Sequence, residues 1–442
     1  KNIRKKMKQL QCIRGCVIQS VKLGSIEIHK DALIKFDVET GKILEFIHDA
    51  SARPIDPDAE EIIHLKPLEF IVPGFIDTHI HAPQYAFMGT ATDRPLMEWL
   101  DKYTFPVEQS FEDLTVATKG YSAVIERALS EGITTAMYFA TIHIEASELF
   151  ADLLEKYGQR GFVGMVSMDR NSPQEYHHST AKCLELAERL IHYIQSKKSQ
   201  IVLPVLTPRF IPTCTPELLE GLGQLAQQYD VHVQSHIAES HDEEAFVEQL
   251  HPGSRDCELF DKAGLLTRKT CMAHGVHLNS DELQLIQSRG SALAHCPLSN
   301  FFFANGVLPL SDILEKKVKV GLGTDVAGGY NISMLSAMRT TVLAHKARLI
   351  YEKASCTNTM DIDYKTAFWL ATLGGARALE LEDKIGSFAI GKSFDALVID
   401  PTAQIDIFPR DTLDDVFQKF INLGDSRNMK SVWVNGKKVY PR

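Results

Sequence analysis

Two histidines separated by one residue, His79 and His81, close an apolar run that begins at residue 70. Side chains two residues apart on a β-strand point to the same side, so both imidazoles can reach one metal ion. His236 and Asp325 end two further apolar runs. Three imidazoles and a carboxylate suit zinc and also iron, so these four residues are candidate ligands. Histidines of the core or surface, and a helix N-cap role for Asp325, are the alternatives.

Glu239 lies three residues after His236, the third candidate histidine ligand. Glu239 would lie just beyond the strand that ends in His236, facing the same cavity. A metal ion lowers the pKa of its bound water towards neutrality, and a nearby carboxylate can then carry the proton. We therefore expect Glu239 to carry this proton, with an exposed glutamate in the loop ESHDEE as the alternative.

Three more histidines lie at or near the ends of apolar runs. His274 would sit opposite the water, where it could stabilise a developing negative charge. We expect His277, three residues later, to be an ordinary loop residue. For His295, a supporting role behind the site and a purely structural hydrogen bond both stay open.

The elements that must position these residues alternate regularly. Short β-branched, apolar runs are separated by stretches with helical spacing, such as SAVIERALSEG and SDELQLIQSRG. Eight buried strands alternating with helices predict a (β/α)8 barrel, whose strands end together on the face where active sites form; an open α/β sheet is the alternative. The eight runs span residues 70–81, 133–140, 162–168, 201–209, 231–239, 270–276, 291–297 and 318–325.

Both ends of the chain differ from this pattern. Residues 11–72 alternate short apolar stretches with turns, and FDALVID and SVWVNGKKVYP repeat that texture near the C-terminus. We expect residues 11–72 and 386–442 to form one composite β-sandwich domain, and residues 73–385 to form the catalytic barrel.

The composition excludes several classes of protein. The net charge of −10 disfavours a general nucleic-acid binder, and no apolar run approaches the roughly 18 residues of a membrane span. Eight cysteines without a C-x-x-C pair predict reduced thiols in a cytoplasmic protein. We expect the basic segment KNIRKKMK at residues 1–8 to be a solvated tail.

Two motifs match chemistry that their context does not support. Residues 386–393 read G-x-x-x-x-G-K-S, but a β-type run follows where a phosphate-binding loop needs a helix, so we predict a turn. His143 and Glu145 form an H-x-E pair, but the P-C-x-x-C of the zinc deaminases that use it is absent. Cys271 and Cys296 are expected to be small buried residues.

The order of these motifs resembles that of the amidohydrolase superfamily. The sequence PGFIDTHIH is followed by His236 at the end of the fifth predicted strand, His274 at the end of the sixth and Asp325 at the end of the eighth. No Lys ends strand four, where binuclear members carry a bridging lysine; Arg209 stands there instead. The H-x-x-E at strand five is typical of the mononuclear deaminase branch. The likeness runs from the first β unit to GKSFDALVID and so covers nearly the whole chain.

Within that branch the chain is most similar to the guanine deaminase group, through stretches such as DTHIHAPQYAFMG, WLDKYTFP, TPRF, QSHIAES, MAHGVHL and GLGTDVAGGYNISML. The resemblance implies one zinc ion per subunit, held by His79, His81, His236 and Asp325. It implies Glu239, His274 and Asp325 as catalytic residues. The implied purine-binding residues are His81, Gln84, Arg209, Phe210, Glu239 and His274.

Two positions depart from the group's pattern. Pro83 stands in HAPQ where a small polar residue is common, and could shift the backbone beside Gln84. Leu298 stands in HCPLSN where Asn is common, and could alter the wall of the pocket.

The resemblance implies hydrolysis of guanine to xanthine and ammonia, without a redox cofactor or a nucleophilic side chain. One alternative is another aminohydrolase or a chlorohydrolase, with an adenosine-like or triazine substrate. A non-catalytic barrel used as a scaffold is the alternative from a different class. A homodimer is the default expectation for a soluble enzyme.

Overall fold

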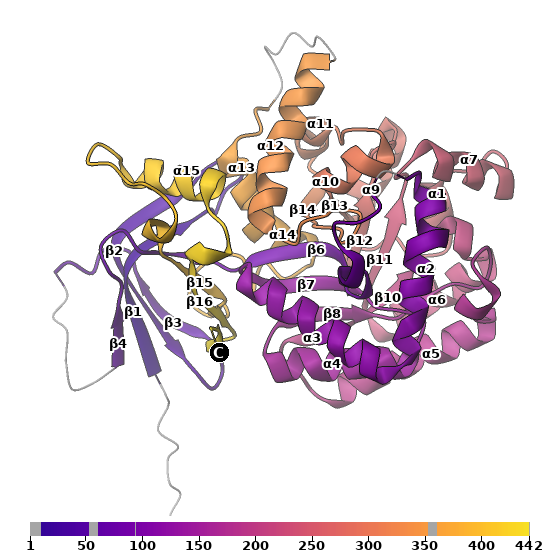
Figure 1. Cartoon of the computed structure of the whole chain (residues 1–442), viewed down its shortest axis with the longest axis horizontal. Helices are drawn as coiled ribbons and strands as arrows, with labels where there is room; N and C mark the ends of the chain where they lie inside the picture. Colours follow the sequence, from indigo (N-terminus) through magenta and orange to yellow (C-terminus); the bar gives the residue numbers. More distant parts are fainter. Residues whose placement is uncertain (1–9, 53–60, 93, 352–359, 442) are drawn as a thin grey trace, which may run out of the picture.

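The computed structural model describes residues 10–52, 61–92, 94–351 and 360–441 (Figure 1). The predicted basic tail at residues 1–8 lies outside these residues, as does Cys356. Within them, two β-sheets and a layer of helices account for most of the regular structure. Among the described helices, none is long and apolar enough to cross a membrane.

The larger sheet is the predicted barrel. Its strands are parallel, and along the sheet they follow one another in chain order. A two-residue strand, β9 (Val166–Ser167), extends the pairing with the fourth of them. The eight strands are β6 (Phe75–His81), β7 (Ile133–Phe139), β8 (Arg160–Gly164), β10 (Val202–Pro208), β11 (His232–Ile237), β12 (Thr270–His274), β13 (Ala292–His295) and β14 (Lys319–Leu322).

Hydrogen bonds from the first strand to the last strand, and to the segment just after it, bring the two edges of this sheet together. The Thr78 hydroxyl donates to the Leu322 carbonyl at 2.9 Å, and the Asp325 amide donates to the His79 carbonyl at 2.9 Å. The second bond places the candidate carboxylate directly beside the H-x-H pair. The prediction of a (β/α)8 barrel is confirmed.

Helices surround the barrel, and local sequence sets where several of them begin and end (Figure 1). The Asp113, Ser179 and Thr215 side chains accept hydrogen bonds from backbone amides at three helix starts. Gly158, at φ 76°, ends α4 in a left-handed conformation that a larger residue would adopt only with strain. The main outer helices are α3 (Leu114–Ser130), α4 (Ile144–Tyr157), α5 (Thr180–Ser196), α6 (Pro216–Tyr229), α8 (Asp256–Lys262), α9 (Ser280–Arg289), α11 (Leu310–Glu315) and α12 (Met334–Tyr351).

Shorter helices lie in the loops and after the barrel. The segment α1 (Leu96–Trp99) and α2 (Phe105–Gln109) comes between β6 and β7, and α7 (His241–Leu250) follows β11 directly. The others are α10 (Pro297–Ser299), α13 (Tyr364–Trp369), α14 (Gly375–Ala378) and α15 (Leu413–Leu423).

The smaller sheet joins the two ends of the described chain, as predicted. Its order is β17-β16-β15-β5-β1-β2-β3, with β4 beside the first half of β1. The Phe36 ring of β2 stacks on Phe394 at 4.0 Å and meets Trp433 of β16 edge-on at 5.7 Å. Because β2 and β16 are far apart in the strand order, the sheet must curl over its own core. Its strands are β1 (Leu10–Gln19), β2 (Glu27–Asp37), β3 (Ile43–Ile47), β4 (Glu61–His64), β5 (Phe70–Pro73), β15 (Ala396–Ile399), β16 (Met429–Val434) and β17 (Lys437–Tyr440).

A single residue connects the two sheets. Gly74 separates β5 from β6, and a Cβ atom there would lie 2.1 Å from the Thr134 hydroxyl, so only glycine fits. A buried ion pair between Arg160 of β8 and Asp395, 3.0 Å long, also joins the barrel to the smaller sheet. We keep residues 72/73 and 385/386 as the proposed domain boundaries.

The G-K-S motif lies in a turn before β15, with no helix after it. The Lys392 ammonium donates to the Ser387 hydroxyl at 2.7 Å and to the Ile385 carbonyl at 3.3 Å. The Lys392 ammonium group therefore bonds to residues of the same turn, as expected for a structural loop.

Candidate metal centre and active site

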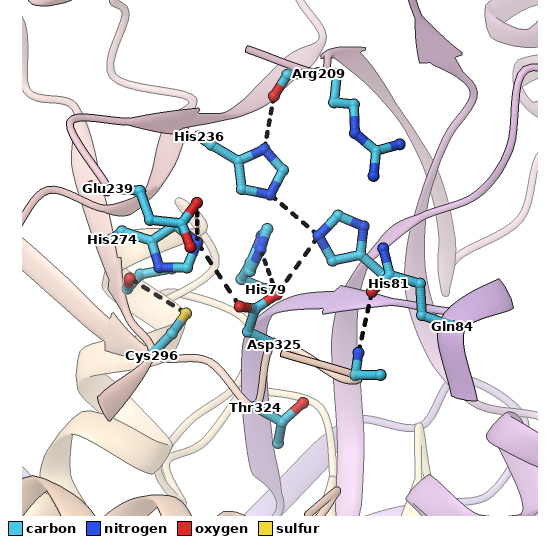
Figure 2. Close-up of polar contacts among 12 residues, drawn as sticks. His79, His81, Gln84, Arg209, His236, Glu239, His274, Cys296, Thr324 and Asp325 are labelled. Atoms are coloured by element: carbon cyan, nitrogen blue, oxygen red, sulfur yellow. Dashed lines mark hydrogen bonds and ion pairs between the residues drawn. The ribbon is translucent and has the colours of Figure 1, made fainter. Parts of the chain in front are cut away.

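The candidate metal ligands meet at the carboxyl ends of β6, β11 and β14 (Figure 2). The Nε2 atoms of His79 and His81 lie 3.2 and 3.5 Å from the same oxygen, Oδ1 of Asp325. The Nε2 atom of His81 is also 3.1 Å from Nε2 of His236. Four ligands at about 2.05 Å from a tetrahedral zinc ion stand roughly 3.3 Å from one another. All three distances fall close to that value.

The protonation states of these side chains are also those that can bind a metal cation. His236 donates its Nδ1 proton to the Arg209 carbonyl at 2.6 Å, which leaves Nε2 with a lone pair facing His81. Burial lowers the pKa of His79, His81 and His236, so all three imidazoles are neutral at pH 7. Burial opposes ionisation of Asp325, but the contact with the neighbouring His79 imidazole holds the pKa of Asp325 below its ordinary value. Neutral imidazoles beside a carboxylate are the form that binds a metal.

His274 competes with His81 for the fourth ligand position. The ligand atoms of His79, His236, His274 and Asp325 all lie within 4.8 Å of one another. However, Nε2 of His274 is 3.8 Å from Asp325 Oδ2 and 3.6 Å from Glu239 Oε2, farther than the contacts of His81. His274 donates its Nδ1 proton to Asn300 Oδ1 at 2.9 Å, which points Nε2 between the two carboxylates. The roles of His81 as ligand and of His274 as its neighbour remain predictions.

Glu239 is buried, at 6% exposure, so the alternative of an exposed loop glutamate is wrong. Two hydrogen bonds hold the backbone here. The Glu239 amide donates to the Glu243 carboxylate at 2.7 Å, and the Ala238 amide donates to the Asp256 carboxylate at 2.9 Å. Ala238 has a φ of 44°, a conformation that needs such support. Burial raises the pKa of Glu239 to about 7, which suits a group that takes up and releases a proton near neutrality.

Asp325 does not cap a helix, because α12 begins only at Met334. Beneath it, the buried Asp77 accepts hydrogen bonds from the Thr324 amide at 3.0 Å and from the Thr324 hydroxyl. Burial raises the pKa of Asp77 to about 7. This carboxyl group fixes the turn that presents Asp325.

A cavity opens beside these groups. It joins the candidate catalytic residues to an apolar wall of Phe210, Leu100, Trp99 and Phe303. Every predicted site residue except His79 lines it. The lining residues are His81, Gln84, Leu96, Trp99, Leu100, Arg209, Phe210, His236, Glu239, His274, Ser299, Phe303, Asp325 and Gly328.

Glu108 of α2, which no sequence motif singled out, is fully buried and organises the polar side of the cavity. Its carboxylate accepts hydrogen bonds from Nη1 and Nη2 of Arg209 at 2.7 and 3.2 Å. It also accepts from Gln84 Nε2 at 2.9 Å and from the Tyr176 hydroxyl at 2.8 Å. The Arg209 charge is therefore balanced, and two of the predicted purine-binding side chains, those of Arg209 and Gln84, are fixed by one carboxylate. Glu108 follows the motif WLDKYTFP by two residues, the one signal that could have drawn attention to it.

Four residues that the sequence singled out lie elsewhere. His295 is buried behind the site, and burial lowers its pKa to about 3, so it is neutral and outside the cavity lining. Burial raises the pKa of Cys271 to about 12, as expected for an inert thiol. The Cys296 thiol donates to the Ala294 carbonyl at 3.5 Å. His143 precedes α4 and lines no part of the cavity.

The two departures from the family pattern have different surroundings. Pro83 begins the short 3-10 helix at residues 83–87 that carries Gln84, so it does shape the backbone beside that residue. Leu298 is half-buried in α10 and does not itself line the cavity, whereas its neighbour Ser299 does, so an effect of Leu298 on the pocket wall stays a prediction.

Comparison with known proteins places these features in a family. The amidohydrolase family model matches residues 70–439. The chain is 40% identical to a guanine deaminase of Dictyostelium discoideum, over 98% of both chains, and 43% identical to that of Rattus norvegicus, over 97% of this chain and 96% of the relative. The crystal structure of guanine deaminase from C. acetobutylicum with bound guanine superimposes with a TM-score of 0.90 at 33% identity, covering 98% of this chain and all of that one. The chain belongs to the amidohydrolase family.

Proposed function

We propose that this protein hydrolyses guanine to xanthine and ammonia. The observation that carries the proposal is the cavity itself, in which a buried glutamate and a cluster of metal ligands face the anchored side chains of Arg209 and Gln84. Relatives that share nearly the full length of the chain are guanine deaminases, which agrees with this chemistry.

The metal in this proposal is one zinc ion per subunit, held by His79, His81, His236 and Asp325. The spacing of these ligands, close to the edges of a tetrahedron, supports the assignment. When bound, the ion supplies a water molecule that loses its proton near neutral pH. Iron accepts the same donors, so metal analysis of the purified protein decides between the two.

Glu239 moves the protons of the reaction. It takes one proton from the attacking water and delivers it to the ring nitrogen next to the carbon that carries the amino group. Glu239 then carries a second proton from the newly added hydroxyl group to the amino group, so the C–N bond breaks, ammonia leaves and the C–O bond becomes the new carbonyl of xanthine. His274 Nε2 lies 3.6 Å from the Glu239 carboxylate, where it orients the oxygen that is being added.

Arg209, Gln84 and Phe210 orient the purine. Glu108 uses one N–H from each terminal nitrogen of Arg209, so the remaining N–H groups are available to a carbonyl acceptor. Gln84 gives one N–H to Glu108 and accepts from the Ala327 amide at 3.1 Å, which fixes its amide plane. Fixed donors favour a purine that bears a carbonyl over adenine, because buried donors without acceptors are costly.

A substrate panel tests the proposal. Ammonia release from guanine, adenine, cytosine and an aminotriazine is measured with the metal-loaded protein. We expect turnover of guanine to exceed that of the others by at least a hundredfold. Faster turnover of adenine or the triazine would assign another aminohydrolase activity, and a protein with neither metal nor turnover would support the scaffold alternative.

A homodimer in the cytoplasm completes the proposal. No disulfide links the seven cysteines of the described residues, and all seven are buried, which is consistent with a reducing compartment. Light scattering after gel filtration measures the assembly, and a monomer mass of 49.5 kDa would contradict the dimer.

A further inference from the structure

A second group of metal-binding side chains lies at the rim of the barrel, outside the cavity described above. It consists of His241 and Glu244, in the first turn of α7, and His277, in the loop after β12. One ligand atom from each residue lies within 4.8 Å of the others. The two imidazole rings face each other with centroids 3.9 Å apart and an angle of 35° between their planes. Ligand atoms from the start of α7 and from the loop after β12 therefore lie close together.

His277 is oriented as a ligand would be. Its Nε2 proton goes to the Ala304 carbonyl at 3.2 Å, so the lone pair is on Nδ1. Metal-binding histidines commonly fix their tautomer in this way, by giving the proton of the other nitrogen to an oxygen. Burial lowers the pKa of His277, which keeps the ring neutral at pH 7.

Glu244 is also held in place before any ion binds. Its Oε1 atom accepts a hydrogen bond from Arg255 Nη2 at 2.7 Å, and the same nitrogen donates to the His277 carbonyl at 2.9 Å. Its Oε2 atom accepts a hydrogen bond from His241 Nδ1 at 3.0 Å, and a metal ion held between these two atoms would replace that proton. Arg255 thus connects α7 with the loop after β12 and leaves one carboxylate oxygen for an ion.

We propose that His241, Glu244 and His277 form a second, exchangeable site for a divalent transition-metal ion, with water completing its coordination. Two imidazoles and one carboxylate favour Zn²⁺, Ni²⁺ or Cu²⁺ over Mg²⁺ and Ca²⁺, which prefer oxygen ligands. The His241 side chain is 76% exposed, so the ion enters directly from solvent and exchanges with it. A bound ion ties the start of α7, two residues after Glu239, to the loop that begins after His274.

The test uses the full-length protein with its tightly bound metal retained. Excess metal is removed by dialysis, and Ni²⁺ is then titrated by calorimetry into wild type, His241→Ala and His277→Ala. His192→Ala is the matched control, because His192 is an exposed histidine on α5 whose partner is Tyr229. We expect one additional equivalent in wild type and in the control. Each rim variant should weaken this binding at least tenfold, with Mg²⁺ and Ca²⁺ giving no binding heat.

Two further measurements separate this site from the deeper one. Metal analysis after dialysis should find the tightly bound equivalent unchanged in every variant. Electron paramagnetic resonance of Cu²⁺ added to the holoprotein should show coupling to two nitrogens, and to one in either rim variant. The proposal is overturned if wild type takes up no additional ion, or if the additional ion survives both rim substitutions.

Discussion

Replacing Glu108 with Gln removes the charge that balances Arg209 while nearly preserving the shape of the side chain. Four hydrogen bonds from three side chains converge on the Glu108 carboxylate. The amide of Gln has one oxygen, which can accept two of them, and its NH₂ group faces the remaining donors. The Arg209 guanidinium is 3% exposed and has no other described carboxylate within ion-pair distance. The substitution therefore leaves a buried positive charge without compensation.

The magnitude follows from that arrangement. Breaking a buried ion pair by removing one partner costs about 3–5 kcal/mol of stability. The free energy of unfolding of a typical domain is about 5–15 kcal/mol, so the Glu108→Gln variant should still fold but should unfold at a distinctly lower urea concentration than wild type. Losing the hydrogen bonds that fix Arg209 and Gln84 should also cost about 1.5–3 kcal/mol in the transition state, a fall of roughly 10- to 150-fold in kcat/KM for guanine.

A double-mutant cycle separates the ion pair from general damage. Arg209→Met removes the partner charge, and combining it with Glu108→Gln leaves a neutral pair. We expect the double variant to be more stable than the sum of the single effects predicts, by about 2 kcal/mol. Urea unfolding and ammonia release are the assays. A Glu108→Gln protein within about 1 kcal/mol of wild type, or strictly additive effects, would refute the reasoning.

Three other predictions follow from the site and its supports. Glu239→Gln should keep the metal and bind guanine, but lower turnover by about a thousandfold or more, because the amide cannot accept the proton; activity within tenfold of wild type would remove Glu239 from the mechanism. Lys392→Ala should leave guanine turnover within about twofold of wild type, since the Lys392 ammonium bonds only within its own turn in the described structure; ATP binding by the wild-type protein through this loop would contradict this interpretation. Burial raises the pKa of Asp256 to about 6, so the folded protein retains a proton that the unfolded chain loses between about pH 4 and 6, and stability falls as pH rises there. Asp256→Asn should therefore gain stability relative to wild type across that window; a constant difference in urea unfolding would contradict this pKa.

The parts of the site that could be predicted from the sequence are those fixed by local geometry. The period of two on a strand brings His79 and His81 to the same carboxylate oxygen. The common ends of parallel strands bring His236 and Asp325 to the same place. Periodicity and strand ends are properties of short segments, so a single sequence reveals them.

The support of the site could not be predicted in this way. Glu108 is 24 residues from Gln84 and 101 from Arg209, and only the packing of α2 over the mouth of the barrel brings them together. Asn300 orients His274, and Asp256 holds Ala238, across similar gaps in the sequence. The curl of the smaller sheet likewise depends on contacts between the two ends of the chain, such as Phe36 with Phe394. No local pattern encodes such contacts.

The pairing of β5 with β15 affects how the protein emerges from the ribosome. Pro73 is the partner of Ala396, and 323 positions separate the two in the chain. At about 5–20 residues per second, β5 waits roughly 16–65 s for its neighbour to be synthesised. During that time the half-built sheet presents an open apolar edge, the kind of surface that leads nascent chains to aggregate. We therefore expect the smaller sheet to determine how much the protein needs chaperones while it is synthesised, although the active site lies in the barrel.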